Sequence, residues 1–234
     1  MSDVIIVGAG IFGSTIAAEL RSLGMNVMVL DAQLPNSGSA PSAGLIKPSW
    51  YAAMKGTYEI AMNCLGRHWP VKDLQFRVAP SKIQATVHFV PPAVVLNTGV
   101  VLKEKVTRVI ETNSGSAIVE CESGAEYSAR ALILAAGIWT RELTPLPQLK
   151  GKAGVAFRFP GQVAEPFIRP WAPYKQVVAF NIDEEEIWIG DGTGVLMENY
   201  TQERQAQALT RCAKQLELPE AQATAHFGIR PFIK

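Results

Sequence analysis

A glycine-rich turn near the N-terminus constrains the fold more than any other feature of this sequence. Residues 3–7 form a short apolar run, typical of a buried parallel strand, that leads directly into Gly8-Ala9-Gly10-Ile11-Phe12-Gly13. Apolar residues then recur at helical spacing over residues 11–23, and residues 26–30 form a second apolar run that ends at Asp31. This order of strand, glycine loop, helix and strand predicts an α/β fold that begins with a nucleotide-binding unit.

Each part of the loop suits the binding of a pyrophosphate. Gly8 permits the tight turn, Gly10 lets the backbone approach the phosphates, and Gly13 lets the helix pack closely on the strand. The N–H groups at the start of the helix, at Ile11 and Phe12, offer the phosphates a partial positive charge. An ordinary glycine-rich turn before a helix is the alternative interpretation, but the flanking strands favour the phosphate loop.

An acidic residue at the end of the second strand completes the pattern. Asp31 stands 18 residues after Gly13 and is followed by Ala32. A carboxylate at this place accepts hydrogen bonds from ribose hydroxyls and disfavours a 2′-phosphate. We therefore expect Asp31 to contact the ribose of a dinucleotide and count Ala32 among the cofactor-binding residues.

The middle of the chain favours FAD over a nicotinamide cofactor. Three alternating runs, near residues 101–109, 117–121 and 126–129, are followed by an apolar strand at residues 131–135. The stretch up to Trp139 resembles the second signature of FAD-binding proteins, and small residues such as Ala136 and Gly137 let the backbone pass close to a cofactor. No second glycine motif has the spacing for NAD(P)H, so we expect the substrate itself to donate the electrons.

Composition and charge exclude several classes of protein. The chain has 234 residues, 48% of them hydrophobic, and a net charge of +1, so no overall field draws it to nucleic acid or to a membrane. Its cysteines, Cys64, Cys121 and Cys212, lie far apart, which predicts neither a disulfide framework nor a metal site and favours a cytoplasmic location. The N-terminus lacks a basic leader, and no apolar stretch is long enough to cross a bilayer.

The remainder predicts a second unit, small, mostly antiparallel and of α+β type. Residues 35–49 form a Pro-, Ser- and Gly-rich loop, and helices are expected over residues 51–65 and over residues 202–216, the latter with Thr201 as its cap. Strands are expected within residues 74–90 and at residues 155–159, 176–181 and 186–190. We assign residues 1–50, 98–142 and 225–234 to a Rossmann-type FAD-binding domain, interleaved with a substrate domain of residues 51–97 and 143–224.

Four pieces of sequence carry a resemblance to a known family. They are the loop of residues 8–13, Ala43-Gly44-Leu45-Ile46, Ala135-Ala136-Gly137 and Gly228-Ile229-Arg230-Pro231. In this order they resemble the D-amino-acid oxidase superfamily, in particular its glycine oxidases and related amine oxidases. Residues 187–193 also resemble the family's strand that ends in Gly-x-Thr. The resemblance implies a flavoprotein with noncovalently bound FAD.

The resemblance also implies roles for individual residues. Ala43, Gly44 and Leu45 would lie against the flavin ring and Val106 near the adenine. The full predicted site comprises the catalytic residues Arg230 and Lys47 and the cofactor-binding residues Gly8, Gly10, Ile11, Phe12, Gly13, Asp31, Ala32, Ala43, Gly44, Leu45, Val106, Ala136, Gly137 and Trp139.

The two catalytic residues each have an alternative interpretation. Arg230 matches the family arginine that clamps the substrate carboxylate, a role that suits a planar, permanently charged guanidinium; the alternative is a surface arginine near a frayed terminus. Lys47 follows the flavin loop and either stabilises negative charge on the reduced flavin or is a solvated lysine.

Two departures from the family pattern bear on assembly. The sequence ends four residues after Arg230, where the family continues with a strand, a glycine-rich loop and a helix that caps the flavin. We therefore expect either a second subunit of a homo-oligomer to complete the site or weaker flavin binding. Residues 92–99 leave no room for the usual full helix, which predicts a more open flavin face.

Two basic segments that contain aromatic residues suggest a further partner, modified DNA or RNA. Residues 47–82 carry six Lys or Arg against two acidic residues, and residues 150–175 carry five against one. The aromatic residues among them are Trp69, Phe76, Trp171 and Tyr174. This composition suits a groove for unpaired bases. An ordinary basic surface, balanced by the acidic residues 183–186, is the alternative.

These observations predict an FAD-dependent oxidoreductase that oxidises the C–N bond of an amino acid or secondary amine by hydride transfer to flavin. The amine is expected to be glycine-like and either free or attached to a nucleic-acid base. The alternative is a non-catalytic flavin-binding protein, or a partner-dependent flavin-binding subunit of a dehydrogenase.

Overall fold

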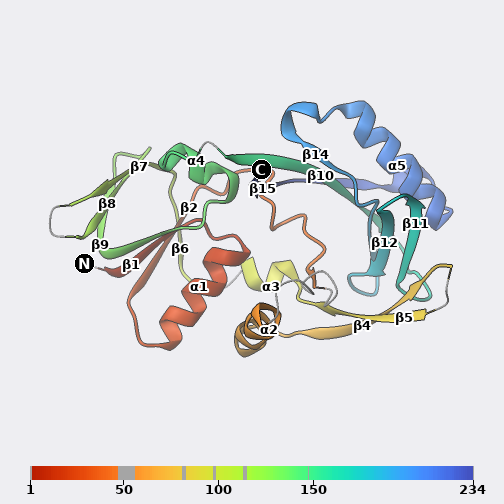
Figure 1. The fold of residues 1–234 in the computed structure, drawn as a ribbon, viewed down its shortest axis with the longest axis horizontal. Coiled ribbons are helices and arrows are strands. Elements are labelled where there is room, and N and C mark those ends of the chain that lie inside the picture. Colours follow the sequence, from red (N-terminus) through yellow and green to blue (C-terminus); the bar gives the residue numbers. More distant parts are fainter. Residues whose placement is uncertain are drawn as a thin grey trace.

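The computed structural model describes residues 2–46, 56–80, 83–96, 99–112, 115–146 and 148–233. Two β-sheets lie side by side, each with helices packed on it, and the chain passes between them several times (Figure 1). The predicted fold class, an α/β unit of Rossmann type interleaved with a mostly antiparallel unit, is confirmed.

The first sheet has the strand order β6-β2-β1-β9-β8-β7. Its strands are β1 (Ser2–Val7), β2 (Val27–Asp31), β6 (Val101–Lys103), β7 (Val106–Glu111), β8 (Ala117–Cys121) and β9 (Glu126–Leu134). The central β1 is parallel to β2 and to β9, and β6 extends the parallel part beside β2. The strands β7, β8 and β9 form an antiparallel meander. The helix α1 (Ile11–Ser22) connects β1 to β2, as predicted.

The structure divides two of the predicted runs differently. Residues 101–109 form two strands, because β6 pairs in parallel with β2 whereas β7 pairs with β8. Residues 126–129 and 131–135 were expected as separate runs, but residues 126–134 form the single strand β9. This strand pairs with β8 through residues 126–129 and with β1 through residues 129–134. The change of partner explains the change of side-chain pattern without a turn.

The strand β1 is buried on both faces, which is why it reads as a continuous apolar run. Val4 and Ile6 pack with Ala17 of α1 on one face. Ile5 and Val7 pack with residues of the meander on the other face. Each such side chain contributes about 1.5–3 kcal/mol on burial, so β1 fixes the position of the glycine loop that follows it.

The second sheet has the order β14-β10-β13-β12-β11-β4-β5-β3, and β15 pairs with β10. Its strands are β3 (Leu45–Ile46), β4 (Lys72–Val78), β5 (Ile83–Phe89), β10 (Leu149–Pro160), β11 (Phe167–Ala172), β12 (Lys175–Asn181), β13 (Glu186–Gly190), β14 (Gly194–Leu196) and β15 (Thr224–Ile233). Adjacent strands in this sheet are antiparallel, except that β11 and β4 are parallel. We assigned residues 225–234 to the cofactor domain, and the structure pairs β15 with β10 over ten residues.

One face of the second sheet is covered by the helix α5 (Gln202–Leu216). The helix has the predicted bounds, and Thr201 caps it by accepting a hydrogen bond of 3.3 Å from the backbone N–H of Arg204. Ala208 and Cys212 pack against Phe157 and Ile189 of the sheet. The opposite face of the sheet is therefore the one that is free to line a site.

The other helices are short. The helix α2 (Thr57–His68) extends three residues beyond the predicted end, and the predicted start at residue 51 lies outside the described residues. The helix α3 (Pro92–Leu96) has five residues. Between the sheets lie a 3-10 turn, η2 (Gly137–Trp139), and α4 (Thr140–Leu143); η3 (Met197–Asn199) and η4 (Glu220–Gln222) flank α5. Among the described residues, no helix has both the length and the apolar character needed to span a membrane.

Candidate cofactor and substrate site

A cavity of about 1030 Å³ lies where the two sheets meet. Its volume is at the upper end of the range for small-molecule and cofactor sites, roughly 300–1,000 Å³. The glycine loop after β1, the segment after β2, α3 and residues 229–231 of β15 contribute to its walls. The cavity therefore joins the predicted phosphate loop to the predicted substrate arginine.

Two glycines of the loop have no room for a side chain. Gly8 has φ +103°, and a Cβ there would stand 2.5 Å from the carbonyl oxygen of Ala135. A Cβ at Gly13 would overlap the carbonyl oxygen of Gly8, because the helix passes directly over the end of the strand. These contacts bring the N-terminus of α1 close to β1 and β9.

The N-terminus of α1 faces the cavity without a compensating acid. Gly10 is the N-cap and offers no side chain, and the first turn contains no acidic residue. The hydroxyl of Ser39, in the segment after β2, accepts a hydrogen bond of 3.0 Å from the backbone N–H of Ile11. A helix start of this kind attracts anions such as phosphate.

Asp31 connects the two loops at the ends of β1 and β2. Its Oδ2 accepts a hydrogen bond of 2.5 Å from the backbone N–H of Ala9, and its Oδ1 accepts one of 2.6 Å from that of Gln33. A carboxylate has about four acceptor positions, so two remain for ribose hydroxyls. Asp31 thus holds the glycine loop in place and lines the cavity at the same time.

Most of the predicted cofactor residues lie on the cavity wall. Those that line it are Gly8, Gly10, Ile11, Phe12, Asp31, Ala32, Gly44, Val106, Ala136, Gly137 and Trp139. Gly13 packs under the loop instead, and Ala43 and Leu45 pack against the core around Phe76. Lys47 lies outside the described residues. The roles of all these residues stay predictions.

The residues present fit FAD. The Cβ positions of Gly8 and Gly13 are filled by backbone, the helix start is electropositive, and the cavity lining also includes Val106 and Arg230. The ADP half would be held by the Gly8–Gly13 turn and Asp31, and the remaining length of the cavity suits the isoalloxazine half.

Arg230 lies in a paired strand on the cavity wall, where a Cβ at Gly38 would be 3.4 Å from its Cγ. Its neighbour Ile229 is buried, whereas Arg230 is exposed and lines the cavity. The pairing of β15 with β10 continues to Ile233, so Arg230 is not part of a frayed end. Among the described residues, no carboxylate lies within 4.0 Å of its guanidinium nitrogens. An uncompensated arginine at a cavity wall suits a substrate carboxylate.

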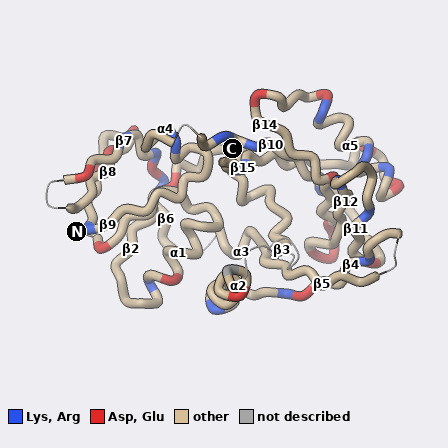
Figure 2. Tube along the Cα trace, in the orientation of Figure 1, with Lys and Arg blue, Asp and Glu red and all other residues tan. Residues whose placement is uncertain are grey.

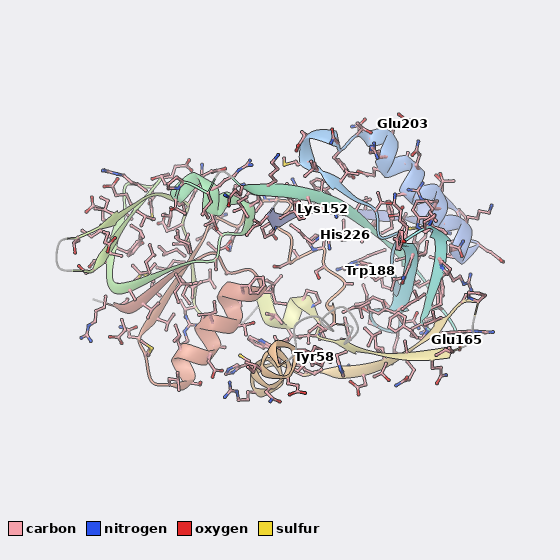
Figure 3. All side chains as sticks on the ribbon, in the orientation of Figure 1. Tyr58, Lys152, Glu165, Trp188, Glu203 and His226 are labelled. Atoms are coloured by element: carbon pink, nitrogen blue, oxygen red, sulfur yellow. The ribbon has the colours of Figure 1, made fainter. Side chains whose placement is uncertain are left out.

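His226 shares the face of β15 that carries Arg230, because the two residues are separated by an even number of positions. Figure 3 shows His226, Lys152 and Trp188 on the side of the second sheet that faces α2 and α3, away from α5. Burial, and then the positive charge of Arg158, lower the pKa of His226, while Glu186 opposes this shift. The imidazole is therefore neutral at neutral pH.

The basic segments do not form the predicted aromatic groove as a whole. Trp69 and Phe76 are buried and cannot stack on a base. Arg67 pairs with Glu19, and Arg77 with Glu165, both at 2.8 Å. The other two aromatic residues are not buried in this way. The ring centroid of Trp171 lies 4.4 Å from Cζ of Arg211, and Tyr174 is fully exposed.

Glu19, Cys64 and His68 form a polar cluster between α1 and α2 that the sequence analysis missed. Their donor atoms lie within 4.8 Å of one another. Nε2 of His68 stands 2.5 Å from Oε2 of Glu19, which is hydrogen-bond contact and closer than two ligands of one zinc ion, at about 3.4 Å. Cys64 and His68 are four residues apart, a spacing that would have revealed the cluster had the helix been predicted to reach His68. The cluster fixes α2 against α1.

The fold and the site define a dinucleotide-binding protein of the Rossmann class with a second, mostly antiparallel sheet over the cavity. Residues 3–82 match the family model DAO, described as FAD dependent oxidoreductase. This match confirms the predicted resemblance to the D-amino-acid oxidase superfamily, and the matched family is described as one of FAD-dependent oxidoreductases. No curated protein matches the sequence.

Solved structures share the fold at low sequence identity. The glycerol-3-phosphate dehydrogenase from Bacillus halodurans, complexed with FAD, matches with a TM-score of 0.72 and 15% identity over 100% of this chain and 57% of its own. The glycine oxidase from Geobacillus kaustophilus matches with a TM-score of 0.63 and 17% identity, over 100% of this chain and 83% of its own. The iminodiacetate oxidase from Chelativorans sp. BNC1 matches with a TM-score of 0.62 and 17% identity, over 99% of this chain and 84% of its own. The chain thus spans little more than half of the dehydrogenase.

Proposed function

We propose that this protein binds FAD and oxidises the C–N bond of a small amino acid or secondary amine that carries a carboxylate. The observation that carries the proposal is Arg230, an uncompensated cation on the wall of the cavity that begins at the glycine loop. The names of two structural neighbours, a glycine oxidase and an iminodiacetate oxidase, support this class of substrate.

The protein residues supply binding and orientation. When bound, FAD would supply the redox chemistry, as the acceptor for a hydride from the carbon beside the amine. Arg230 would hold the substrate carboxylate through charge-assisted hydrogen bonds and so limit its orientation in the cavity. His226 is neutral at neutral pH and has an acceptor nitrogen for a proton that leaves the substrate ammonium, directly or through water.

A free small amine is favoured over an amine attached to nucleic acid. The predicted groove needed aromatic side chains beside free basic groups, but Trp69 and Phe76 are buried, and Arg67 and Arg77 are in ion pairs. The positive charge that is not paired with an acidic side chain is therefore smaller than the sequence indicates.

The test is flavin reduction without oxygen. The FAD-loaded protein is mixed anaerobically with glycine, sarcosine and other small amino acids, and the loss of flavin absorbance is followed. For the best substrate, Arg230→Met should lower the apparent second-order rate constant by at least about 30-fold, since such a charge contact contributes about 2–5 kcal/mol. Arg204→Met, an exposed arginine on α5, is the matched control and should change nothing.

The outcomes separate the proposal from its rival. A protein that holds FAD but is reduced by no amine is the non-catalytic or partner-dependent flavin-binding protein. A protein that is reduced equally fast with and without Arg230 has another carboxylate site. A protein that binds no FAD contradicts both interpretations.

A further inference from the structure

Two cations face each other across β10 and β15. Lys152 and Arg230 are direct partners in this antiparallel ladder, so their side chains leave the sheet on the same face. That face is the one opposite α5, and Figure 3 shows Lys152 on it. Lys152 is half-buried, and Arg230 lines the cavity.

Like charges directly opposite each other in a ladder are destabilising unless an anion lies between them. The strands β10 and β15 carry four Lys or Arg and no acidic residue, and Figure 2 shows basic residues at the start of β10. Arg158, on the same strand, is paired with Glu186 at 3.1 Å. Within the described residues, by contrast, neither Lys152 nor Arg230 has a carboxylate within 4.0 Å.

The side chains of the two cations converge over one glycine. A Cβ at Gly194 of β14 would stand 2.9 Å from Cε of Lys152 and 3.3 Å from Nη2 of Arg230. The same nitrogen would be 3.9 Å from a Cβ at Gly154. The absence of side chains at these two glycines therefore leaves room above the sheet for the end of the Lys152 side chain and for the guanidinium of Arg230. The Lys152 ammonium lies 5.8 Å from the ring centroid of Phe232, at the limit of a cation–π interaction.

We propose that Lys152 and Arg230 form a subsite for a dianionic ligand, and that the amine substrate carries two carboxylates. Arg230 holds the carboxylate beside the reacting carbon, and Lys152 holds the second. The proposal rests on the proposed function for the identity of the amine, but the binding of a dianion by the two cations does not depend on turnover. Each anionic group would neutralise one of two charges that otherwise repel.

Binding is measured first, by calorimetry on the FAD-loaded protein, with acetate and malonate as probes. Malonate should bind at least about tenfold more tightly than acetate, since one further charged hydrogen bond contributes about 1.5 kcal/mol or more. Lys152→Met should lower the ratio of the two affinities to near one. Lys150→Met removes an equal charge from the same strand, but Lys150 is paired with Phe232 and not with Arg230, so this variant should keep the ratio. The melting temperature of Lys152→Met without ligand should be equal to or higher than that of the native protein, because a repulsion is removed.

Turnover is measured second, with sarcosine and iminodiacetate, two achiral secondary amines that differ by one carboxylate. Iminodiacetate should be preferred in kcat/KM by the native protein, and the preference should vanish in Lys152→Met. If malonate is preferred but neither amine reduces the flavin, the subsite stands and the proposed reaction fails. If amines are oxidised but Lys152→Met keeps both ratios, the subsite is refuted and the reaction stands. Inorganic phosphate that competes as strongly as malonate would overturn the assignment to a dicarboxylate.

Discussion

Arg211 of α5 donates two hydrogen bonds to one oxygen of Asp191. Its Nε and Nη2 lie 2.9 and 2.6 Å from Oδ2 of the carboxylate, which is completely buried. Thr193 donates to the same carboxylate through its backbone N–H, at 2.8 Å, and its hydroxyl, at 2.7 Å. The pair therefore connects α5, which covers one face of the second sheet, to the loop that leads into β14 at Gly194.

Asp191→Asn should destabilise the protein by about 3 kcal/mol, because the guanidinium of Arg211 loses its buried partner. Arg211→Met should cost more, because the charge left behind is the fully buried carboxylate, whereas the Arg211 side chain is 28% exposed and can be hydrated. Urea unfolding followed by circular dichroism measures both variants. Equal stability of the two variants, or a native-like Asp191→Asn, would contradict this account.

Mutation should separate the role of Gly13 in folding from the role of Gly10 in FAD binding. Gly13→Ala should lower the free energy of unfolding by about 3 kcal/mol, because its Cβ overlaps the carbonyl oxygen of Gly8. Gly10→Val should fold, since the position is limited only by the side chain of Ser39 at 3.1 Å, but it should release FAD because its side chain occupies the place of the pyrophosphate. Thermal unfolding and the absorbance of the desalted protein distinguish the two effects. FAD retained by Gly10→Val would place the phosphates elsewhere.

The contact between α1 and α2 should make stability depend on acid pH. The hydrogen bond from His68, with help from Arg67, holds the pKa of Glu19 below its usual range despite some desolvation. A carboxyl group whose pKa is lowered by folding stabilises the protein above its unfolded pKa, and that stabilisation is lost as the pH falls below about 4 and through the folded pKa. Glu19→Gln should flatten this part of the curve of unfolding free energy against pH. An unchanged slope in the variant would exclude Glu19 as its source.

Of the three cysteines, Cys64 alone should react with a thiol reagent in the folded protein. Burial is the main cause that raises the pKa of Cys212 far above its ordinary value, and burial also raises the pKa of Cys121. Cys64 is only partly buried. Labelling with Ellman's reagent should therefore modify one thiol in native buffer and three in denaturant. Rapid native labelling of the Cys64→Ser variant would show that α5 or the meander opens readily.

Local sequence was sufficient for the elements whose pattern has one explanation. The loop of residues 8–13 and the helix capped by Thr201 were placed correctly because glycine spacing, apolar periodicity and a cap residue all agree there. The division of residues 101–109 into β6 and β7 was not predictable, because both halves are β-prone and only their partners, β2 and β8, differ. The end of α2 was missed because the contact of His68 with Glu19 is made 49 residues away along the chain.

The site shows the same division. The sequence by itself determined where the glycine loop, the acid at the end of β2 and the candidate arginine stand, and it predicted their roles, since each depends on the chemistry of a short segment. Only the tertiary structure decided that Asp31 also ties two loops together, that Trp69 and Phe76 are core residues, and that Lys152 and Arg230 meet over Gly194. Charges 78 residues apart become neighbours only through the register of β10 with β15. Register is a property of the assembled sheet, because it depends on hydrogen bonds and packing between strands that are distant in the sequence.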